Sequence, residues 1–404
     1  MYEEKYLVFV SENNNNKFYH MKRNGNTFTA TWGRVGTAGQ CKSYPISQWD
    51  KKLQEKLAKG YTDQSDLHRV VEVKKETEYK KLDNEGMQEV MDFLMSCAQK
   101  TIQANYKISG KDVTSAMITA ARHQLNRIAA EINKTGDIHK INELLLELFS
   151  IIPRKMGKVQ DYLASPNTDL EKLYQRESDL LDVMSGQVVS TVVDDSHCST
   201  TSNQTILENL GLKMRDITKE EEEKIKKLLG TESGLFSRAW AITNHTTQKK
   251  FDSFLENHRK PSGRRMTRKL LWHGSRNENW ISILKTGLVL RPDAKITGKM
   301  FGCGIYFAPK AKKSIGYTSL SGSYWAGGDS NRAYMALFDV AYGTPYHTDN
   351  NHSISPDFKW RDLQRILPGA SCLHAHAGKQ LRNDEIIFYR EDQVTVKYLV
   401  ELKR

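Results

Sequence analysis

The chain begins with alternating apolar and polar positions, and apolar residues at helical spacing follow. Residues 5–31 contain β-prone runs separated by a polar segment, SENNNNK, and by the dipeptide Asn24-Gly25. Asn-Gly between such runs is typical of a hairpin turn. We therefore expect a small antiparallel sheet, and we attach no function to the asparagine run. Between residues 46 and 60 apolar side chains recur at helical spacing and end at a glycine, which predicts one helix beside the sheet.

The strand pattern disappears near Met87, and amphipathic helical patterns continue to about Val189. Apolar residues recur every three or four positions, which places them on one face of each predicted helix. Asp112 is the predicted N-cap of the second helix. Leucine and methionine at this spacing form a core in most proteins, so we assign no chemistry to these helices. Four helices are predicted, over residues 87–102, 112–132, 141–153 and 170–184.

Two polar segments without periodicity divide the chain. A charged stretch at 72–81 and a stretch rich in Ser, Thr and Asp at 191–205 are predicted to be linkers. After the second linker, helical and strand patterns mix, which is typical of an α+β domain. We therefore predict three domains, over residues 1–78, 84–192 and 204–404: a small sheet with a helix, an all-α bundle, and a mixed α+β fold.

Composition limits the class of protein further. The chain has 404 residues, of which 38% are hydrophobic and 27% charged, with five scattered cysteines and a formal charge of +12. These values are typical of a globular protein, and the acidic start of the sequence is unlike a signal peptide. We expect an intracellular soluble protein with reduced thiols and no membrane segment. The positive charge is compatible with a polyanionic partner, although it is also compatible with ordinary solvated surface.

Three separated segments of the C-terminal half combine polar side chains with β-prone runs. LLWHGSR places His273 at the end of a predicted strand, GCGIYF places Tyr306 in a short β-prone run, and NDEIIFY places Glu385 directly before an apolar run. Strand ends are common positions for ligand contacts. Taken alone, Glu385 is also consistent with an exposed charge that precedes a strand.

Several other chemistries are disfavoured by the motifs. No GxxxxGK[ST] is present, and GCGIYF has Phe307 where a dinucleotide fingerprint requires its third glycine. Ser275 does not lie in a G-x-S-x-G elbow, so it is a poor candidate for a nucleophile. The histidines could form a metal site by number, but they form loose pairs without a carboxylate motif. We therefore predict no metal at His347, His352, His374 and His376, and none at His197, which with Cys198 has no second ligand pair nearby.

Near the N-terminus, Trp32-Gly33-Arg34-Val35-Gly36 combines an indole, glycines and a guanidinium in a turn. One interpretation is a core tryptophan with a surface arginine, and the other is an indole that stacks on a nucleic-acid base while Arg34 pairs with phosphate. WGRVGT together with KLAKGYT resembles the WGR domain. That domain binds broken DNA ends in ADP-ribosyltransferases of the DNA damage response. The resemblance therefore implies DNA contacts for Trp32 and Arg34.

The middle and the C-terminal half resemble the same family. GKDVTSAMITAARHQL and LFSIIPRKMG are similar to the helical regulatory domain of DNA-dependent poly(ADP-ribose) polymerases, which restrains access to the NAD pocket. LLWHGSR, TGKMFGCGIYFAP, KSIGY, NDEIIFY and KYLVELK resemble its catalytic domain. The order His, Tyr, Glu matches the family's catalytic triad. The resemblance implies catalytic roles for His273, Tyr306 and Glu385, and NAD contacts for His273, Gly274, Ser275, Asn279, Tyr306, Ser314 and Tyr317.

These residue types suit cleavage of the bond between nicotinamide and ribose. Positive charge develops on the sugar during that cleavage, so a fixed carboxylate such as Glu385 lowers the barrier. Members of the family that elongate chains carry Glu at this position, so the resemblance implies polymer formation. The expected substrate is NAD+, and the expected partners are DNA strand breaks, acceptor proteins and the chain itself. The expected compartment is the nucleus in a eukaryote, or the cytoplasm and nucleoid in a bacterium.

Two alternative functions stay open at this point. A mono-ADP-ribosyltransferase would share the fold and transfer single units only. A DNA-end-binding scaffold would keep the N-terminal domain and lack catalytic activity, although the intact triad disfavours it.

Overall fold

The computed structural model describes residues 4–68, 79–106, 113–191, 204–290, 300–348, 354–355, 357–378 and 381–404. By its internal contacts the chain forms two compact units. One unit comprises Met1–Thr77 with Gln99–Val192, and the other comprises Glu78–Ala98 with Val193–Arg404. Among the described residues, none of the helices combines the length and the apolar character needed to cross a lipid bilayer.

The N-terminal part of the first unit is an antiparallel five-stranded sheet in the order β4-β3-β2-β1-β5. The predicted turn at Asn24-Gly25 is confirmed, because Asn24 pairs with Thr27 and Gly25 has a φ of +62°. The predicted helix is also confirmed, and its apolar face packs on a core that includes Phe28. The elements are β1 Glu4–Ser11, β2 Asn15–Asn24, β3 Thr27–Arg34, β4 Gln40–Pro45, α1 Trp49–Ala58, β5 Thr62–Asp63 and α2 Ser65–His68.

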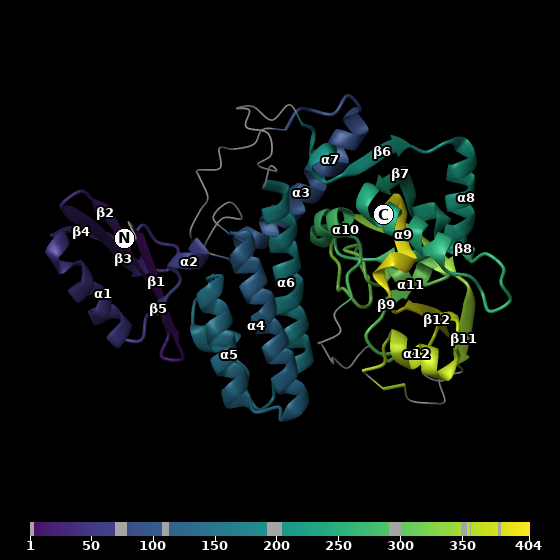
Figure 1. Ribbon diagram of the computed structural model, residues 1–404. Helices are drawn as coiled ribbons and strands as arrows, with labels where there is room; N and C mark the ends of the chain where they lie inside the picture. Colours follow the sequence, from purple (N-terminus) through teal and green to yellow (C-terminus); the bar gives the residue numbers. More distant parts are fainter. Residues whose placement is uncertain are drawn as a thin grey trace. The chain divides into compact units, whose positions relative to one another are not determined.

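The middle of the chain is helical, as predicted. In the first unit α4 contacts both α5 and α6, and the three helices lie side by side (Figure 1). Most of the apolar stripe of α4 is buried, with Met117, Leu125 and Ile128 in the core. Asp112 lies outside the described residues, and the N-cap of α4 is Thr114. The helices are α3 Glu85–Asn105, α4 Ser115–Lys134, α5 Ile138–Ile151 and α6 Leu170–Thr191.

The second unit contains two sheets. Strands β6-β7-β14-β10-β8 form the first, which is antiparallel throughout, and β11-β12-β13-β9 form the second, in which only the β11–β12 pair is parallel. The strands of the first sheet are β6 Leu212–Asp216, β7 Phe236–Asn244, β8 Thr267–Gly274, β10 Arg332–Tyr342 and β14 Val394–Lys403. Those of the second are β9 Ile305–Phe307, β11 Thr344–Thr348, β12 Ala370–Ala375 and β13 Glu385–Phe388.

Six helices of the described chain accompany these sheets. They are α7 Ile206–Asn209, α8 Lys219–Leu229, α9 His245–Asn257, α10 Trp280–Thr286, α11 Ala311–Ile315 and α12 Trp360–Ile366. The predicted fold class is therefore confirmed, with an N-terminal sheet, a helical middle and a mixed α+β C-terminal part.

The two sheets of the second unit are joined by backbone hydrogen bonds. The Trp272 amide donates to the Ala308 carbonyl over 2.9 Å, and the Ala308 amide donates to the Trp272 carbonyl over 3.0 Å. Trp272 belongs to β8, whereas Ala308 directly follows β9. This bridge brings the end of one sheet against the edge of the other, and the candidate site lies at this junction.

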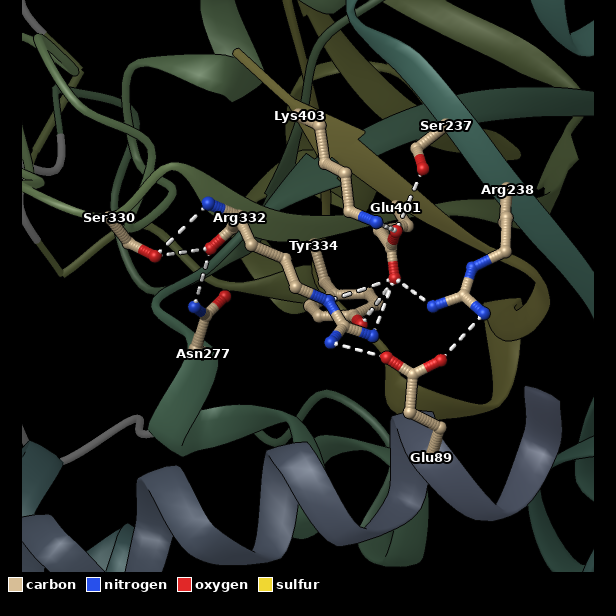
Figure 2. A network of polar contacts seen from close by, with 9 residues as sticks. All are labelled: Glu89, Ser237, Arg238, Asn277, Ser330, Arg332, Tyr334, Glu401 and Lys403. Atoms are coloured by element: carbon tan, nitrogen blue, oxygen red, sulfur yellow. Dashed lines mark hydrogen bonds and ion pairs between the residues drawn. The ribbon is translucent and has the colours of Figure 1, made fainter. Parts of the chain in front are cut away.

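A buried carboxylate lies on the central strand of the first sheet and binds residues of both neighbouring strands. Glu401 on β14 is fully buried and accepts hydrogen bonds from Arg238, Arg332 and Tyr334 over 2.7–2.9 Å (Figure 2). Burial raises the pKa of Glu401, but the donors around it outweigh burial and lower the pKa to about 2. The same two arginines also bind Glu89 on α3, which ties the first half of α3 to the first sheet of the second unit.

Candidate active site

His273 occupies the end of β8 and is held there by contacts on several sides. Its Nδ1 lies 3.0 Å from the carbonyl oxygen of Tyr306, and its ring meets Phe307 and Phe338 edge to face. Burial lowers the pKa of the imidazole below its ordinary value, and the Tyr306 carbonyl only partly opposes this. Because a carbonyl can only accept, Nδ1 carries the proton of the neutral ring. Nε2 is therefore left as a hydrogen-bond acceptor in a fixed orientation.

Gly274 follows His273 at a point where no side chain fits. A Cβ atom at this position would lie 1.9 Å from the carbonyl oxygen of Ser314. The strand end therefore packs directly against the backbone of α11, and Ser314 itself is 4% exposed. Glycine is required here for close backbone approach rather than for an unusual dihedral angle.

Two tyrosines line the same region. The Tyr306 hydroxyl donates to the Gly302 carbonyl over 2.9 Å and accepts from the Phe301 amide over 3.1 Å, which fixes its ring. Tyr317 is 40% exposed, so one part of its ring faces solvent. Burial raises the pKa of Tyr317 to about 12, and the charge of Glu385 adds to the shift. The pKa of Tyr306 is also raised, mainly by burial and further by Glu385.

Glu385 is the first residue of β13 and is 9% exposed. Its carboxylate forms a short ion pair with the ammonium group of Lys313 on α11, and both side chains are nearly buried. The register aligns Ile386 with Phe307, the residue that follows Tyr306. Glu385 therefore lies level with the Trp272–Ala308 bridge, one strand away from β8. A carboxylate on a strand is more rigidly placed than one on a loop, which suits electrostatic catalysis.

Ser275 and Asn279 extend the site beyond the end of β8. The Asn279 side-chain amide donates to Ser275 Oγ over 3.0 Å. The Asn279 Oδ1 atom is buried and has no hydrogen-bond partner in the described part of the chain. A buried unsatisfied acceptor is costly and is often satisfied by a ligand, so Asn279 is a candidate hydrogen-bond acceptor for a bound molecule.

All the predicted residues of the C-terminal site therefore come from one region of the second unit. The sequence did not single out Lys313, although it stands directly before Ser314 in the KSIGY motif. Only the three-dimensional structure, in which α11 lies beside the start of β13, reveals the ion pair between Lys313 and Glu385. Trp325 was also missed: its ring stacks on Tyr317 with centroids 6.1 Å apart and an interplanar angle of 16°.

Trp32 and Arg34 lie in the first unit, on β3. The Trp32 ring is partly buried and stacks on Tyr19 with centroids 6.1 Å apart. The Arg34 guanidinium donates to the carbonyl oxygens of Gly157 over 2.8 Å and of Met156 over 3.1 Å. Both carbonyls belong to the segment after α5, so the side chain links the N-terminal sheet to the helical region.

Asn14, in the asparagine run, also contacts the segment after α5 that Arg34 contacts. Asn14 has a φ of +59°, a conformation that asparagine tolerates better than most residues. Its side chain accepts from the Val159 amide over 3.2 Å, and its carbonyl accepts from Arg34 over 3.3 Å. We predicted only a hairpin loop without function for this run; the structure adds a contact with the helical region.

Comparison with known proteins agrees with this geometry. Residues 219–404 match the family described as Poly(ADP-ribose) polymerase catalytic domain, and residues 3–68 match the WGR domain. These matches and the site described above define the class of protein as a WGR-containing ADP-ribosyltransferase.

Relatives of the chain support the same class. The chain is 34% identical over 187 residues to Uncharacterized protein 101L of Invertebrate iridescent virus 6, covering 46% of this chain and 78% of that protein. It is 31% identical over 138 residues to a poly [ADP-ribose] polymerase-like protein of the same virus, 100L, covering 34% and 71%. Poly [ADP-ribose] polymerase 2 of Zea mays is 25% identical over 406 residues, covering 87% of this chain and 58% of the plant protein. The chain belongs to the poly(ADP-ribose) polymerase family, whose catalytic domain uses NAD+ as substrate.

Proposed function

We propose that this chain is a DNA-break-stimulated enzyme that transfers ADP-ribose from NAD+ to protein acceptors, itself included, and elongates the product. The proposal assigns DNA-end binding to residues 1–78, regulation to 84–192 and catalysis to 204–404. The observation that carries it is the convergence of His273, Tyr306 and Glu385 at the junction of the two sheets, beside a stacked Tyr317.

Structural observations support several of the proposed contacts with NAD+. The neutral His273 presents Nε2 as an acceptor for a ribose hydroxyl of the adenosine half. Gly274 presents its backbone to the nicotinamide carboxamide, and Ser314 adds a hydroxyl from α11. The partly exposed ring of Tyr317 suits stacking on the nicotinamide ring, while Tyr306 packs from the other side. The unsatisfied Asn279 Oδ1, with Ser275 beside it, is a further acceptor for the substrate.

Glu385 acts on the reacting carbon in this proposal. The bond between the nicotinamide nitrogen and ribose C1′ breaks, its electron pair leaves with nicotinamide, and C1′ becomes cationic. The carboxylate stabilises that cation and accepts the proton of the incoming hydroxyl or carboxyl group, whose oxygen bonds to C1′. Lys313 holds the carboxylate in place and must release it for this step.

DNA stimulation is assigned to the junction between the N-terminal sheet and the helical region. A DNA end that recruits Trp32 by stacking and Arg34 by its phosphate would compete with the carbonyls of Met156 and Gly157 for the same guanidinium group. Loss of those hydrogen bonds would weaken the contact between the two regions. We infer that this is how a DNA break relieves restraint of the catalytic domain by the helices.

Nicotinamide release from NAD+, measured with and without blunt or nicked DNA, tests the proposal. We expect slow release without DNA, a large increase with DNA, and a ladder of labelled product on a gel. A single product band would instead support the mono-ADP-ribosyltransferase. No release under either condition would support the scaffold, and release independent of DNA would contradict the regulatory part of the proposal.

A further inference from the structure

We propose that His347, His374 and His376 form a binding site for a divalent transition metal, with zinc as the preferred ion. One ring nitrogen of each histidine lies within 4.8 Å of those of the other two. The sequence favoured no metal because these residues form two separate pairs along the chain. The structure removes that objection, because it brings all three rings to one place on the second sheet of the catalytic unit.

Strand pairing explains how the three rings meet. Strands β11 and β12 are parallel neighbours, and their register places His347 directly beside His374. His376 follows His374 by two residues, so the two side chains leave the same face of the strand. The His376 amide also donates to the Thr348 carbonyl over 3.0 Å, which continues the pairing just past β12. The backbone therefore positions all three imidazoles.

The spacing of the rings suits metal ligation. His347 Nδ1 and His376 Nε2 are 2.8 Å apart, and the ring centroids of the three histidines lie 4.4–5.3 Å from one another. Nitrogens bound to one tetrahedral zinc ion at about 2.1 Å would be roughly 3.4 Å apart. Small side-chain rotations would therefore bring the three nitrogens to ligand distance. Imidazole is a ligand that zinc, copper, nickel and cobalt share.

Asp384 supplies the negative charge and the outer contacts that such a site requires. One carboxylate oxygen lies 2.9 Å from His374 Nε2 and 3.4 Å from His376 Nδ1, and the other accepts from the Ala377 amide over 2.8 Å. Carboxylates that orient metal-binding histidines in this way are common in zinc proteins. Lys269 is a cation near His347, with its ammonium group over the Tyr342 ring, and Asp384 offsets its repulsion of a metal ion.

The position of Asp384 links this site to the catalytic unit. Asp384 directly precedes Glu385, and Ala375 on β12 pairs with Glu385 on β13. A bound ion would therefore fasten β11 and β12 to the start of β13. We expect the ion to stabilise this sheet, and this expectation does not depend on whether the chain is enzymatically active.

Metal binding by the full chain tests the proposal directly. After treatment with a chelator and dialysis, the protein is titrated with Zn2+ against a chromophoric competitor, and with Co2+ while its visible spectrum is recorded. We expect one tight site per chain, the intense visible bands of four-coordinate Co2+, and a zinc-dependent rise in the thermal midpoint. His347→Ala should weaken Zn2+ binding at least tenfold and remove the Co2+ bands, because it deletes a ligand.

The matched control is His245→Ala. His245 is also exposed and lies in the same unit, at the start of α9, but it is remote in sequence from the cluster. Circular dichroism establishes that both variants are folded, and His347→Gln provides a second variant of similar volume. Equal zinc affinity in His347→Ala and His245→Ala would overturn the proposal, as would a Co2+ spectrum with only the weak bands of six-coordinate ions.

Discussion

The ion pairs of Glu89 hold the first half of α3 on the first sheet of the second unit, and the substitution Glu89→Gln tests their role. Glu89 accepts from Arg238 Nη1 over 2.8 Å and from Arg332 Nη1 over 2.9 Å (Figure 2). Glutamine keeps the length and shape of the side chain but removes its charge. The buried apolar residues of the same segment, which include Val90 and Leu94, are unchanged.

The size of the effect follows from the exposure of the pair. The Glu89 side chain is 52% exposed, so each ion pair contributes about 0.5 kcal/mol. Loss of both amounts to about 1 kcal/mol, which corresponds to roughly a fivefold change in an equilibrium constant. Local opening of residues 85–98 should therefore become about five times more frequent. If this segment restrains catalysis, nicotinamide release without DNA should rise by a similar factor, while the rate at saturating DNA should stay constant.

Hydrogen exchange and nicotinamide release measure the two parts of this prediction separately. The control is Asp92→Asn, because Asp92 is an exposed acid on the same helix and accepts a hydrogen bond from Gln88 four residues earlier. The Asp92→Asn variant loses the same negative charge as Glu89→Gln, but it keeps both ion pairs between Glu89 and the sheet. Faster exchange in residues 85–98 without faster basal release would refute the link between this helix and catalysis. Equal exchange in the two variants would refute the estimate from the ion pairs.

Four further predictions concern the candidate site and the WGR domain. Glu385→Gln should bind NAD+ with nearly unchanged affinity. Its turnover number should fall by about a hundredfold or more, since the charge that stabilises the cationic sugar is lost. Equal rates for the variant and the unchanged protein in single-turnover assays would show that Glu385 has no part in the chemical step. Trp32→Ala should raise the DNA concentration for half-maximal stimulation at least about fivefold, because stacking contributes about 1–3 kcal/mol per base; an unchanged titration curve would contradict stacking. Burial lowers the pKa of His273, so its acceptor nitrogen persists at and above pH 6.5 and is protonated only as the pH falls through the lowered pKa. The KM for NAD+ should therefore be flat from about pH 6.5 upward and rise in acid; an inflection above that value would show that another group controls binding. The stability that this neutral histidine contributes should likewise be complete above its unfolded pKa of about 6.5 and decline below it.

Local patterns in the sequence predicted much of this fold. The Asn-Gly turn, the stripe of α4 and the strand ends at His273 and Glu385 all depend on residues close together in the chain, where periodicity and turn chemistry act. The triad was predicted by resemblance, because its three segments keep their order. Its convergence on one junction required the pairing of β13 with β9 and the bridge to β8.

Features that depend on long-range pairing were missed. Lys313 reaches Glu385 only because α11 lies beside β13. Glu401 binds side chains from two strands, β7 and β10, and the arginines among them also bind Glu89 on a helix. The histidine cluster depends on parallel pairing of β11 with β12. A sequence does not show directly which strands lie next to each other. Contacts between side chains on neighbouring strands therefore cannot be predicted from local patterns.

The two hydrogen bonds between Trp272 and Ala308 have a consequence for how this enzyme family diverges. They belong to the main chain, so among the twenty residues only proline would delete an amide donor at either position. The alignment of His273 with the strand that carries Tyr306 is thus insulated from most point mutations. Most substitutions at Trp272 or Ala308 leave both amide donors and both carbonyl acceptors in place. Substitutions around the junction can therefore alter the chemistry of the site while these two main-chain hydrogen bonds persist.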